Sequence, residues 1–283
     1  MHKTPFSVTQ PKSHDAISRL RRPNVLYKTF LSLKKRGFLP TILIIAEYPF
    51  GRLVARHKAN KILRHADIEE RFTEIYRSSY WNSAESVSGG GSTLSYTEKL
   101  RKGLPDLFAK FSIASIFDAP CGDFNWMRYV IEHHSIDYIG GDIVSPLILS
   151  LKERYETNNR RFIHIDLTKS QFPAADLMIC RDCLFHLSYD DTQAVLENFL
   201  RSDIPYLLTS THVNSTGLSN KDIKTGDFRL IDLFSAPYNF PQDVLYRIPD
   251  WREPGPQREM CLWSREQIGD TLKNFNHSGW RAL

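Results

Sequence analysis

The chain has 283 residues, of which 41% are hydrophobic and 12% aromatic, and its formal net charge is +5 at pH 7. This composition predicts a globular protein with one large domain, or with one domain and an extension. Four cysteines are too few for a disulfide scaffold, so we expect reduced thiols.

The positive charge belongs to the N-terminal quarter of the chain. Residues 1–70 hold 14 Lys and Arg against 5 Asp and Glu, whereas the remainder holds 23 against 27. The basic segment 19–64 suits a peripheral membrane surface or an acidic partner, but we favour helices with solvated lysine faces docked on the main domain. We expect no nucleic-acid partner, because the basic residues are not interleaved with aromatic ones.

Neither a membrane span nor a secretory leader is expected. The longest apolar stretch, residues 38–50, is interrupted by Pro40, Glu47 and Pro49 and is shorter than the ~20 residues of a span. The first residues lack the apolar core and small-residue cleavage site of a secretory signal. We therefore expect a cytoplasmic protein.

Two helices are predicted ahead of the main α/β region. The first covers residues 67–81 and has one apolar face: Ile68, Phe72, Ile75 and Tyr76. The second begins near Thr97, with Pro105 as a kink, and has its own apolar face: Leu100, Leu104, Leu107 and Phe108. We expect a basic helical extension over residues 1–70 and a main domain over residues 71–283, which begins with lid helices at 71–111.

Short strand-like runs then alternate with helical ones. The predicted strands are 114–119, 137–143, 161–167, 175–182 and 205–213, and the predicted helices are 125–134, 145–156 and 188–202. A last strand and helix follow residue 258. This alternation predicts a doubly wound, mostly parallel sheet, whose ligands lie beyond the carboxyl ends of the strands.

The turn after the first predicted strand, "DAPCGDF", is poor in glycine. A dinucleotide-binding turn uses several glycines so that the backbone can approach a diphosphate. Here Pro120 and Phe124 stand where two of them would be, and only Gly122 remains. The turn therefore favours a ligand without phosphates.

Acidic residues end the next two strands. Asp142 lies 24 residues after Asp118, the spacing at which such folds place a carboxylate for the ribose hydroxyls. Asp166 suits the exocyclic amine of adenine, because a carboxylate accepts hydrogen bonds. An adenosine without a diphosphate suggests S-adenosylmethionine, although a single Asp at a strand end is often only a cap or turn residue.

The order of the segments "FDAPCGDFNWM", "YIGGDI" and "HIDLTKSQFPAADLMICRDCLFHLS" resembles the class I S-adenosylmethionine-dependent methyltransferases. In particular it looks like a bacterial group that shares the lead-in from Tyr80 to Arg101. The resemblance runs from about residue 80 to 240. It implies a Rossmann-like methyltransferase fold with about seven strands, and S-adenosyl-L-methionine as cofactor. The cofactor contacts that we expect by position are Asp118, Ala119, Pro120, Gly122, Asp142, Ile143, Asp166, Leu167 and Arg181.

The glycine-rich segment Ser86–Ser92 has two interpretations. Its backbone N–H groups, Ser88 and the nearby Arg101 suit the carboxylate of the cofactor's methionine end. Alternatively, the segment is a flexible connector, and both interpretations are compatible with a lid. Asp123 either caps the following helix or contacts the cofactor amine, and we favour the cap.

The segment "CRDCLFHLS" is expected beside the reacting sulfur. Cys180 and Cys183 lack a second ligand pair, so we expect buried thiols and no metal site. Methyl transfer depends mainly on positioning, but Asp182 or His186 can serve as the base for a hydroxyl or amine acceptor. The alternative for His186 is a structural hydrogen bond.

Residues 213–250 are polar and rich in turn residues, which predicts a substrate loop. Its polar residues favour a polar small molecule or a glycan as acceptor: His212, Asn220, Asp222, Asp227, Arg229 and Asn239. We therefore expect an active methyltransferase. The alternatives are a binding module without turnover, acting through its basic N-terminal segment, and, third, a dinucleotide oxidoreductase; the oligomeric state stays open.

Overall fold

The computed structural model describes these parts of the chain: residues 57, 59–81, 83–215 and 217–277. The labelled helices and strands all belong to the compact unit Lys58–Leu283. Most of the basic extension, including nearly all of segment 19–64, lies outside the described residues, so the expectations for it stay predictions. Of the helices in the described ranges, none has the length and apolar character needed to cross a bilayer.

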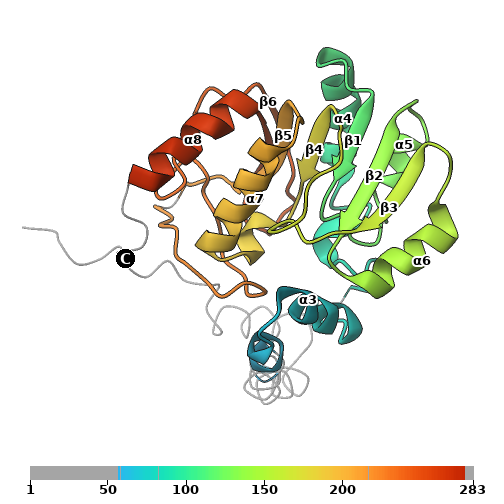
Figure 1. Cartoon of the computed structure of the whole chain (residues 1–283), viewed down its shortest axis with the longest axis horizontal. Helices are drawn as coiled ribbons and strands as arrows, with labels where there is room; N and C mark the ends of the chain where they lie inside the picture. Colours follow the sequence, from blue (N-terminus) through green and yellow to red (C-terminus); the bar gives the residue numbers. More distant parts are fainter. Residues whose placement is uncertain (1–56, 58, 82, 216, 278–283) are drawn as a thin grey trace, which may run out of the picture. The chain divides into compact units, whose positions relative to one another are not determined.

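Seven strands form one sheet in the order β3-β2-β1-β4-β5-β7-β6 (Figure 1). They are β1 Ser115–Asp118, β2 Asp137–Asp142, β3 Arg160–His164, β4 Leu177–Cys180, β5 Tyr206–His212, β6 Tyr246–Pro249 and β7 Arg258–Ser264. Strands β1 to β5 pair in parallel, and β7 runs antiparallel to both β5 and β6. The predicted fold class, a doubly wound and mostly parallel seven-stranded sheet, is confirmed.

The labelled helices flank this sheet and agree with most predicted positions. They are α3 Ile68–Arg77, η1 Gly90–Ser92, α4 Glu98–Lys110, α5 Arg128–Ile131, α6 Ser145–Tyr155, η2 Leu184–His186, α7 Tyr189–Arg201 and α8 Arg265–His277. Asp67 caps α3 by accepting the Glu70 N–H at 3.1 Å, as helix starts require. Helix α5 is shorter than predicted, because the turn after β1 continues to Met127.

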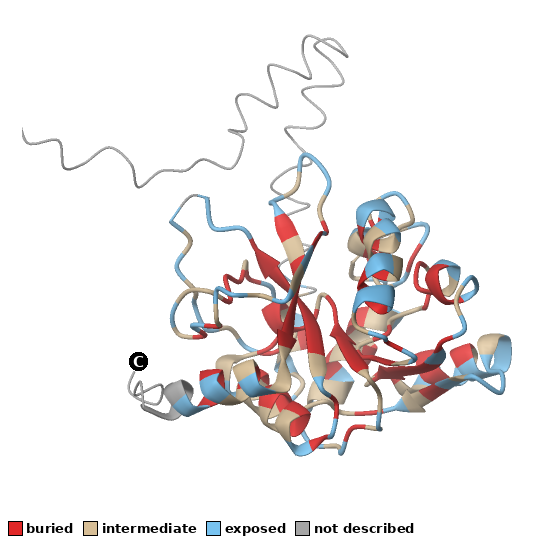
Figure 2. Cartoon of the chain, turned by 90° about the horizontal axis from the view of Figure 1, so that it is seen from above, coloured by how far each residue is buried: buried red, intermediate tan, exposed pale blue. Residues whose placement is uncertain are grey.

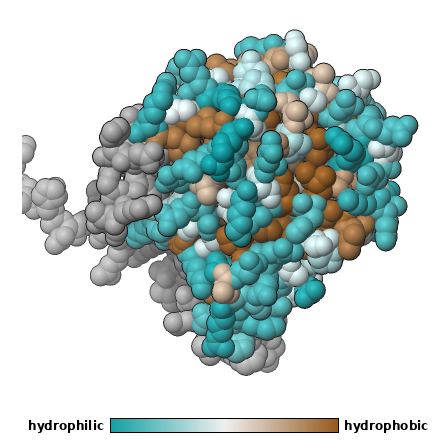
Figure 3. All heavy atoms as spheres, viewed as in Figure 1, coloured by the Kyte–Doolittle hydropathy of each residue, from teal (hydrophilic) through white to brown (hydrophobic). Residues whose placement is uncertain are grey.

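The helices cover the sheet from two sides. Residues of α4, α5 and α6 share one core cluster with Ile116, whereas residues of α7 and α8 share the other with Phe117. Successive residues of a strand thus face opposite cores, as a strand requires. Buried residues follow the strands and exposed ones the outer helix faces (Figure 2). In Figure 3, hydrophobic residues gather between hydrophilic side chains in the middle of the face shown.

The segment between β5 and β6 differs from the sequence prediction at its end. Strand β6, Tyr246–Pro249, lies within the range expected to be loop. It is a short edge strand that pairs only with β7 and ends in proline, so its sequence carries a weak strand signal. The other described residues of 213–245 form no helix or strand. Loop residues bind one another: Asn220 Nδ2 donates to the carbonyl oxygens of Asp232 and Ala236.

Candidate active site

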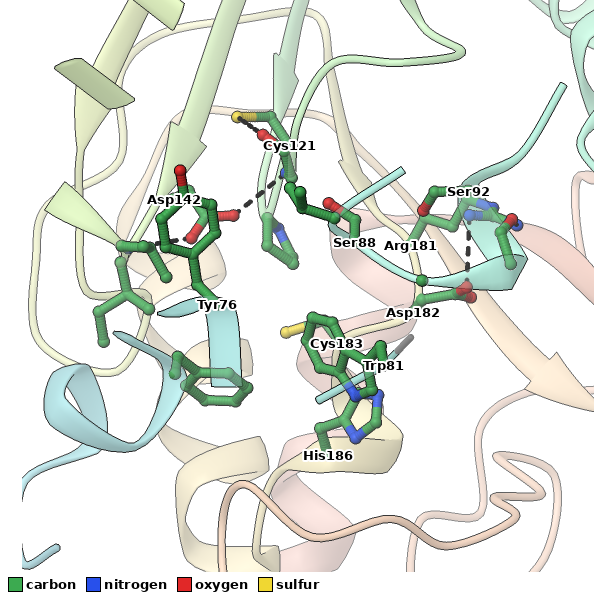
Figure 4. Close-up of a pocket in the computed structure, with 18 of the residues that line it drawn as sticks. Tyr76, Trp81, Ser88, Ser92, Cys121, Asp142, Arg181, Asp182, Cys183 and His186 are labelled. Atoms are coloured by element: carbon green, nitrogen blue, oxygen red, sulfur yellow. Dashed lines mark hydrogen bonds and ion pairs between the residues drawn. The ribbon is translucent and has the colours of Figure 1, made fainter. Parts of the chain in front are cut away.

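A cavity of about 460 Å³ lies at the carboxyl ends of the parallel strands. Figure 4 shows Asp142 and Asp182 on opposite sides of it, with Trp81 and His186 close together. Of the thirteen predicted site residues, eleven line this cavity: Ser88, Asp118, Pro120, Gly122, Asp142, Ile143, Asp166, Leu167, Arg181, Asp182 and His186. Residues far apart in the sequence therefore meet at one site.

The remaining two predicted residues, Ala119 and Arg101, do not line the cavity. Ala119 is fully buried, and its N–H donates to the Ile179 carbonyl at 2.9 Å within the sheet. The Arg101 guanidinium donates to the Leu94 carbonyl at 3.0 Å and to Thr97 Oγ1 at 3.4 Å. Arg101 thus binds the segment that leads into α4. Its predicted contact with the methionine carboxylate stays a prediction.

The turn after β1 explains how a glycine-poor sequence keeps a tight backbone. Gly122 and Phe124 both have left-handed backbone conformations, with φ of +55° and +58°. This conformation strains Phe124, by about 1–2 kcal/mol. Its buried ring offsets the strain by packing on Tyr138 and Phe162, at centroid distances of 5.0 and 5.2 Å. Phe124 therefore takes the conformation that a glycine would take.

The Asp142 carboxylate is the best placed of the three predicted cofactor acids. Its Oδ2 accepts the Gly122 N–H at 3.1 Å, and its Oδ1 accepts the Val144 N–H at 3.0 Å. Burial raises the pKa of Asp142, and these backbone donors oppose the rise. A carboxylate offers about four acceptor positions, so these backbone donors leave room for a ligand.

The other two acids have side-chain partners. Asp118 accepts the Tyr138 hydroxyl at 2.7 Å, and burial raises its pKa to about 7. Asp166 accepts the N–H and hydroxyl of Thr168, at 2.9 and 2.7 Å, and pairs with Lys169 at 3.0 Å. Burial would raise the pKa of Asp166, but Thr168 and Lys169 together lower it. Asp166 thus offers a ligand fewer free positions than Asp142.

The glycine-rich segment is anchored to the turn after β1. The Asp123 carboxylate accepts the Ser86 hydroxyl at 3.0 Å and the Val87 N–H at 2.9 Å, and Ser88 Oγ accepts the Asp123 N–H at 2.9 Å. Since α5 begins only at Arg128, Asp123 neither caps that helix nor lines the cavity. Its role, which the sequence did not indicate, is to hold the segment as one wall of the site.

A buried cluster of charges closes the far side of the cavity. Asp250 Oδ2 accepts Arg181 Nε at 2.9 Å and Arg258 Nη2 at 2.8 Å. Asp182 pairs with Arg258 at 2.8 Å and with Arg181 at 3.3 Å. Burial alone would raise the pKa of Asp182, but the two arginines outweigh it and lower the pKa. A carboxylate so stabilised is a weak base, which argues against the predicted catalytic role of Asp182.

His186 has the environment of a neutral imidazole. Its Nδ1 lies 2.8 Å from the Asp227 carbonyl oxygen, which can only accept, so Nδ1 carries the proton and Nε2 is the acceptor. Burial lowers the pKa of His186. The ring lies 5.4 Å from that of Trp81. The catalytic role predicted for His186 thus stays a prediction with a defined acceptor atom.

Several residues that line the cavity were missed by sequence reasoning: Phe72, Tyr76, Trp81, Tyr96, Trp126, Phe228 and Arg258. Phe72 and Tyr76 belong to the predicted apolar face of α3, which forms a wall of the cavity as well as packing on the core. The apolar face of α3 was the sequence signal that could have identified Phe72 and Tyr76. No sequence signal identified Arg258, because its position depends on how β7 pairs with β5.

The four cysteines are buried free thiols. Cys183 lines the cavity, and its interaction with Cys180 together with burial raises its pKa. Among the described residues, no group of three or more His, Cys, Asp or Glu is arranged to hold a metal ion. We therefore treat the cysteines as apolar packing groups.

No family model matches this sequence, and no curated protein matches it. Among solved structures, the fold is similar to a 1,6-didemethyltoxoflavin-N1-methyltransferase from Burkholderia thailandensis, solved with bound 1,6-didemethyltoxoflavin and S-adenosylhomocysteine. The two share 17% identity and a TM-score of 0.50, over 74% of this chain and 89% of that one. This likeness concerns the fold, which is that of the class I methyltransferases.

Two further solved structures score lower. They are the magnesium protoporphyrin IX methyltransferase ChlM from Synechocystis PCC 6803 and the protein PigF with S-adenosylhomocysteine. ChlM has 14% identity and a TM-score of 0.47, over 71% of this chain and 99% of that one. PigF has 11% identity and a TM-score of 0.45, over 60% of this chain and 56% of that one, little more than half its length.

Proposed function

We propose that this protein is an S-adenosylmethionine-dependent methyltransferase that acts on a small molecule. The observation that carries the proposal is the Asp142 carboxylate, which lines the cavity at the end of β2 and can still accept a hydrogen bond beside its backbone donors. A carboxylate at this place in a doubly wound sheet suits the two hydroxyls of a ribose. The class I fold is consistent with this ligand.

The other residues of the cavity fit the rest of this cofactor. We assign Asp166 and Leu167, which line the cavity after β3, to the adenine, and Asp118 to the ammonium group of the methionine end. A Cβ on Gly122 would meet Ser88 Cβ at 3.0 Å, so the glycine-rich segment packs directly against this turn. The glycine-poor sequence of the turn favours a nucleoside without phosphates.

When bound, S-adenosylmethionine supplies a methyl group on a positively charged sulfur. The chain's own residues have simpler tasks. Asp142 orients the ligand, the wall formed by α3 and the glycine-rich segment excludes water, and His186 Nε2 accepts a proton from the acceptor group. We propose a hydroxyl or an amine as that group.

The first test is calorimetric titration with S-adenosylhomocysteine and with NAD. We expect saturable binding of S-adenosylhomocysteine alone. The variant Asp142→Asn keeps the size of the side chain but removes its charge and one acceptor oxygen, so we expect affinity to fall at least about tenfold. Asp137→Asn is the matched control, since Asp137 is exposed at the opposite end of the same strand. Binding of NAD, or equal affinities in both variants, would contradict the proposal.

A binding module without turnover is the alternative, and it rests on the basic segment outside the described residues. Production of S-adenosylhomocysteine from S-adenosylmethionine with an acceptor present separates the two. The structure gives little support to a polar or glycan acceptor. That expectation was based on six polar residues, of which only His212 lines the cavity.

A further inference from the structure

The cavity has two chemically different halves. The ends of β1 and β2 and the turn after β3 contribute the three acids that we assign to the cofactor. The other half lies beyond β4 and β5 and combines aromatic rings with a charged pair; its lining includes Trp81, Tyr96, Asp182, His186, His212, Phe228 and Arg258. We assign this second half to the methyl acceptor, and both this assignment and the acceptor class inferred from it rest on the proposed function.

Three neighbouring rings in this half, tilted against each other by 37° and 54°, are here called the aromatic wall: Trp81, His186 and Phe228. The ring centroids of Trp81 and His186 lie 5.4 Å apart, and those of His186 and Phe228 lie 5.7 Å apart. Phe228 is 55% exposed although it lines the cavity. A ligand that covers this ring removes apolar surface from water, and a flat π-system does so best.

The charged groups of the acceptor half already bind one another. Asp182 and Arg258 are paired within the buried charge cluster, and Asp182 also accepts the Ser210 hydroxyl at 3.3 Å. His212 Nδ1 lies 3.3 Å from the Ile231 carbonyl oxygen. A sugar, which carries a hydroxyl on most carbons, would lose water at many groups and find few free partners.

The polar loop residues do not supply free partners, because side chains such as Asp222 and Arg229 bind the loop itself or the segment from η2 to the start of α7. Asp222 accepts the backbone N–H groups of Tyr189 and Ile223, both at 2.8 Å. Arg229 donates to the Leu184 and Leu187 carbonyl oxygens. The polar composition of this loop therefore stabilises its fold without a ligand.

The proton acceptor matches an acidic hydroxyl. His186 is flanked by Asp182, Asp227 and Arg229, and burial keeps its pKa below the usual value of about 6.5. The pKa of such a weak base lies far below that of an alkanol, which is close to the pKa of water. It is much closer to that of a phenol, which is about 10 for tyrosine. Proton transfer from a phenol is thus the less uphill of the two.

We propose that the acceptor is a small planar aromatic molecule with a phenol-type hydroxyl, which lies against the aromatic wall and gives its proton to His186 Nε2. The phenol oxygen forms the new C–O bond to the methyl carbon with its own electron pair. The C–S bond of the sulfonium breaks, and its electron pair stays on sulfur as a neutral thioether. The proton passes from the hydroxyl to Nε2 and then to water.

The binding test uses the full chain saturated with S-adenosylhomocysteine. We would titrate 2-naphthol, decahydro-2-naphthol, which has the same carbon skeleton without a π-face, and methyl α-glucopyranoside. We expect 2-naphthol to bind at least tenfold more tightly than either of the others. Phe228→Ala should weaken 2-naphthol binding about 3- to 10-fold, and Phe228→Tyr should restore it. Leu149→Ala is the control, because Leu149 is 59% exposed on α6 outside the cavity.

The turnover test measures S-adenosylhomocysteine formed from S-adenosylmethionine and 2-naphthol. His186→Gln should lower kcat by about 10²- to 10⁴-fold, and this loss should far exceed its effect on 2-naphthol binding, which we expect to weaken no more than in Phe228→Ala. The wild-type rate should fall with acidification below pH 6.5, as His186 becomes protonated, and the variant should lack this dependence. His133→Gln, at an exposed histidine outside the cavity, should match the wild type.

The outcomes separate this inference from the proposed function. If S-adenosylhomocysteine binds in an Asp142-dependent manner but 2-naphthol binds no better than its saturated analogue or the glucoside, the acceptor class is wrong and the proposed function stands. An unchanged kcat in His186→Gln removes the role of Nε2. If S-adenosylhomocysteine does not bind at all, both proposals fail.

Discussion

Asp250→Asn should destabilise the folded protein strongly. The Asp250 side chain is fully buried and accepts three hydrogen bonds, two from Arg181 at 2.9 and 3.0 Å and one from Arg258 at 2.8 Å. The amide has almost the same volume, so no cavity forms. It has a single acceptor oxygen, however, and its NH₂ group would face guanidinium donors.

The expected loss follows from the charge left behind. Removing one partner of a buried ion pair costs about 3–5 kcal/mol, because the remaining charge stays desolvated. At roughly 2–4 °C per kcal/mol for a unit of this size, Tm should fall by about 6–20 °C. Differential scanning calorimetry and urea unfolding measure this directly.

Two further variants sharpen the test. Asp106→Asn, at an exposed position on α4, should change stability by less than about 0.5 kcal/mol. Adding Arg181→Met to Asp250→Asn removes a positive charge with the negative one, so the double variant should lose less stability than the sum of the single losses. If Asp250→Asn behaved like Asp106→Asn, the charge cluster would not stabilise the fold and the reasoning would be refuted.

Three other predictions concern the first turn. Because burial raises the pKa of Asp118 to about 7, above about 3.9 in the unfolded chain, the folded state binds the proton more tightly and loses stability as pH rises from 4 to 7. Asp118→Asn should abolish that loss, at most about 4 kcal/mol, and identical pH profiles in urea unfolding would contradict this. Gly122→Ala should strain the turn, displace Ser88 and weaken S-adenosylhomocysteine binding, whereas Gly217→Ala, at φ +72° with open space around it, should show the backbone effect alone. Phe124→Gly should lose about 2–4 kcal/mol in chemical denaturation, because the lost ring packing exceeds the relieved strain; a more stable variant would overturn this account.

The architecture and the row of acids could be predicted from the sequence. Alternating strand and helix patterns indicate a parallel sheet, and the carboxyl ends of parallel strands meet at one edge. Asp118, Asp142 and Asp166 could therefore be placed together from their positions along the chain. Short-range periodicity contains this information, because it records which face of each element is buried.

How each side chain is used depends on the tertiary structure. Phe124 adopts a glycine-like conformation because its ring finds a buried site between distant strands and α6. Asp123 binds the glycine-rich segment, more than thirty residues earlier in the chain. Arg258 meets Asp182 only because β7 enters the sheet beside β5. These partners are far apart in sequence, and local patterns do not encode which distant groups satisfy a donor or acceptor. The same reason explains why the polar loop suggested a polar acceptor while the cavity wall is aromatic.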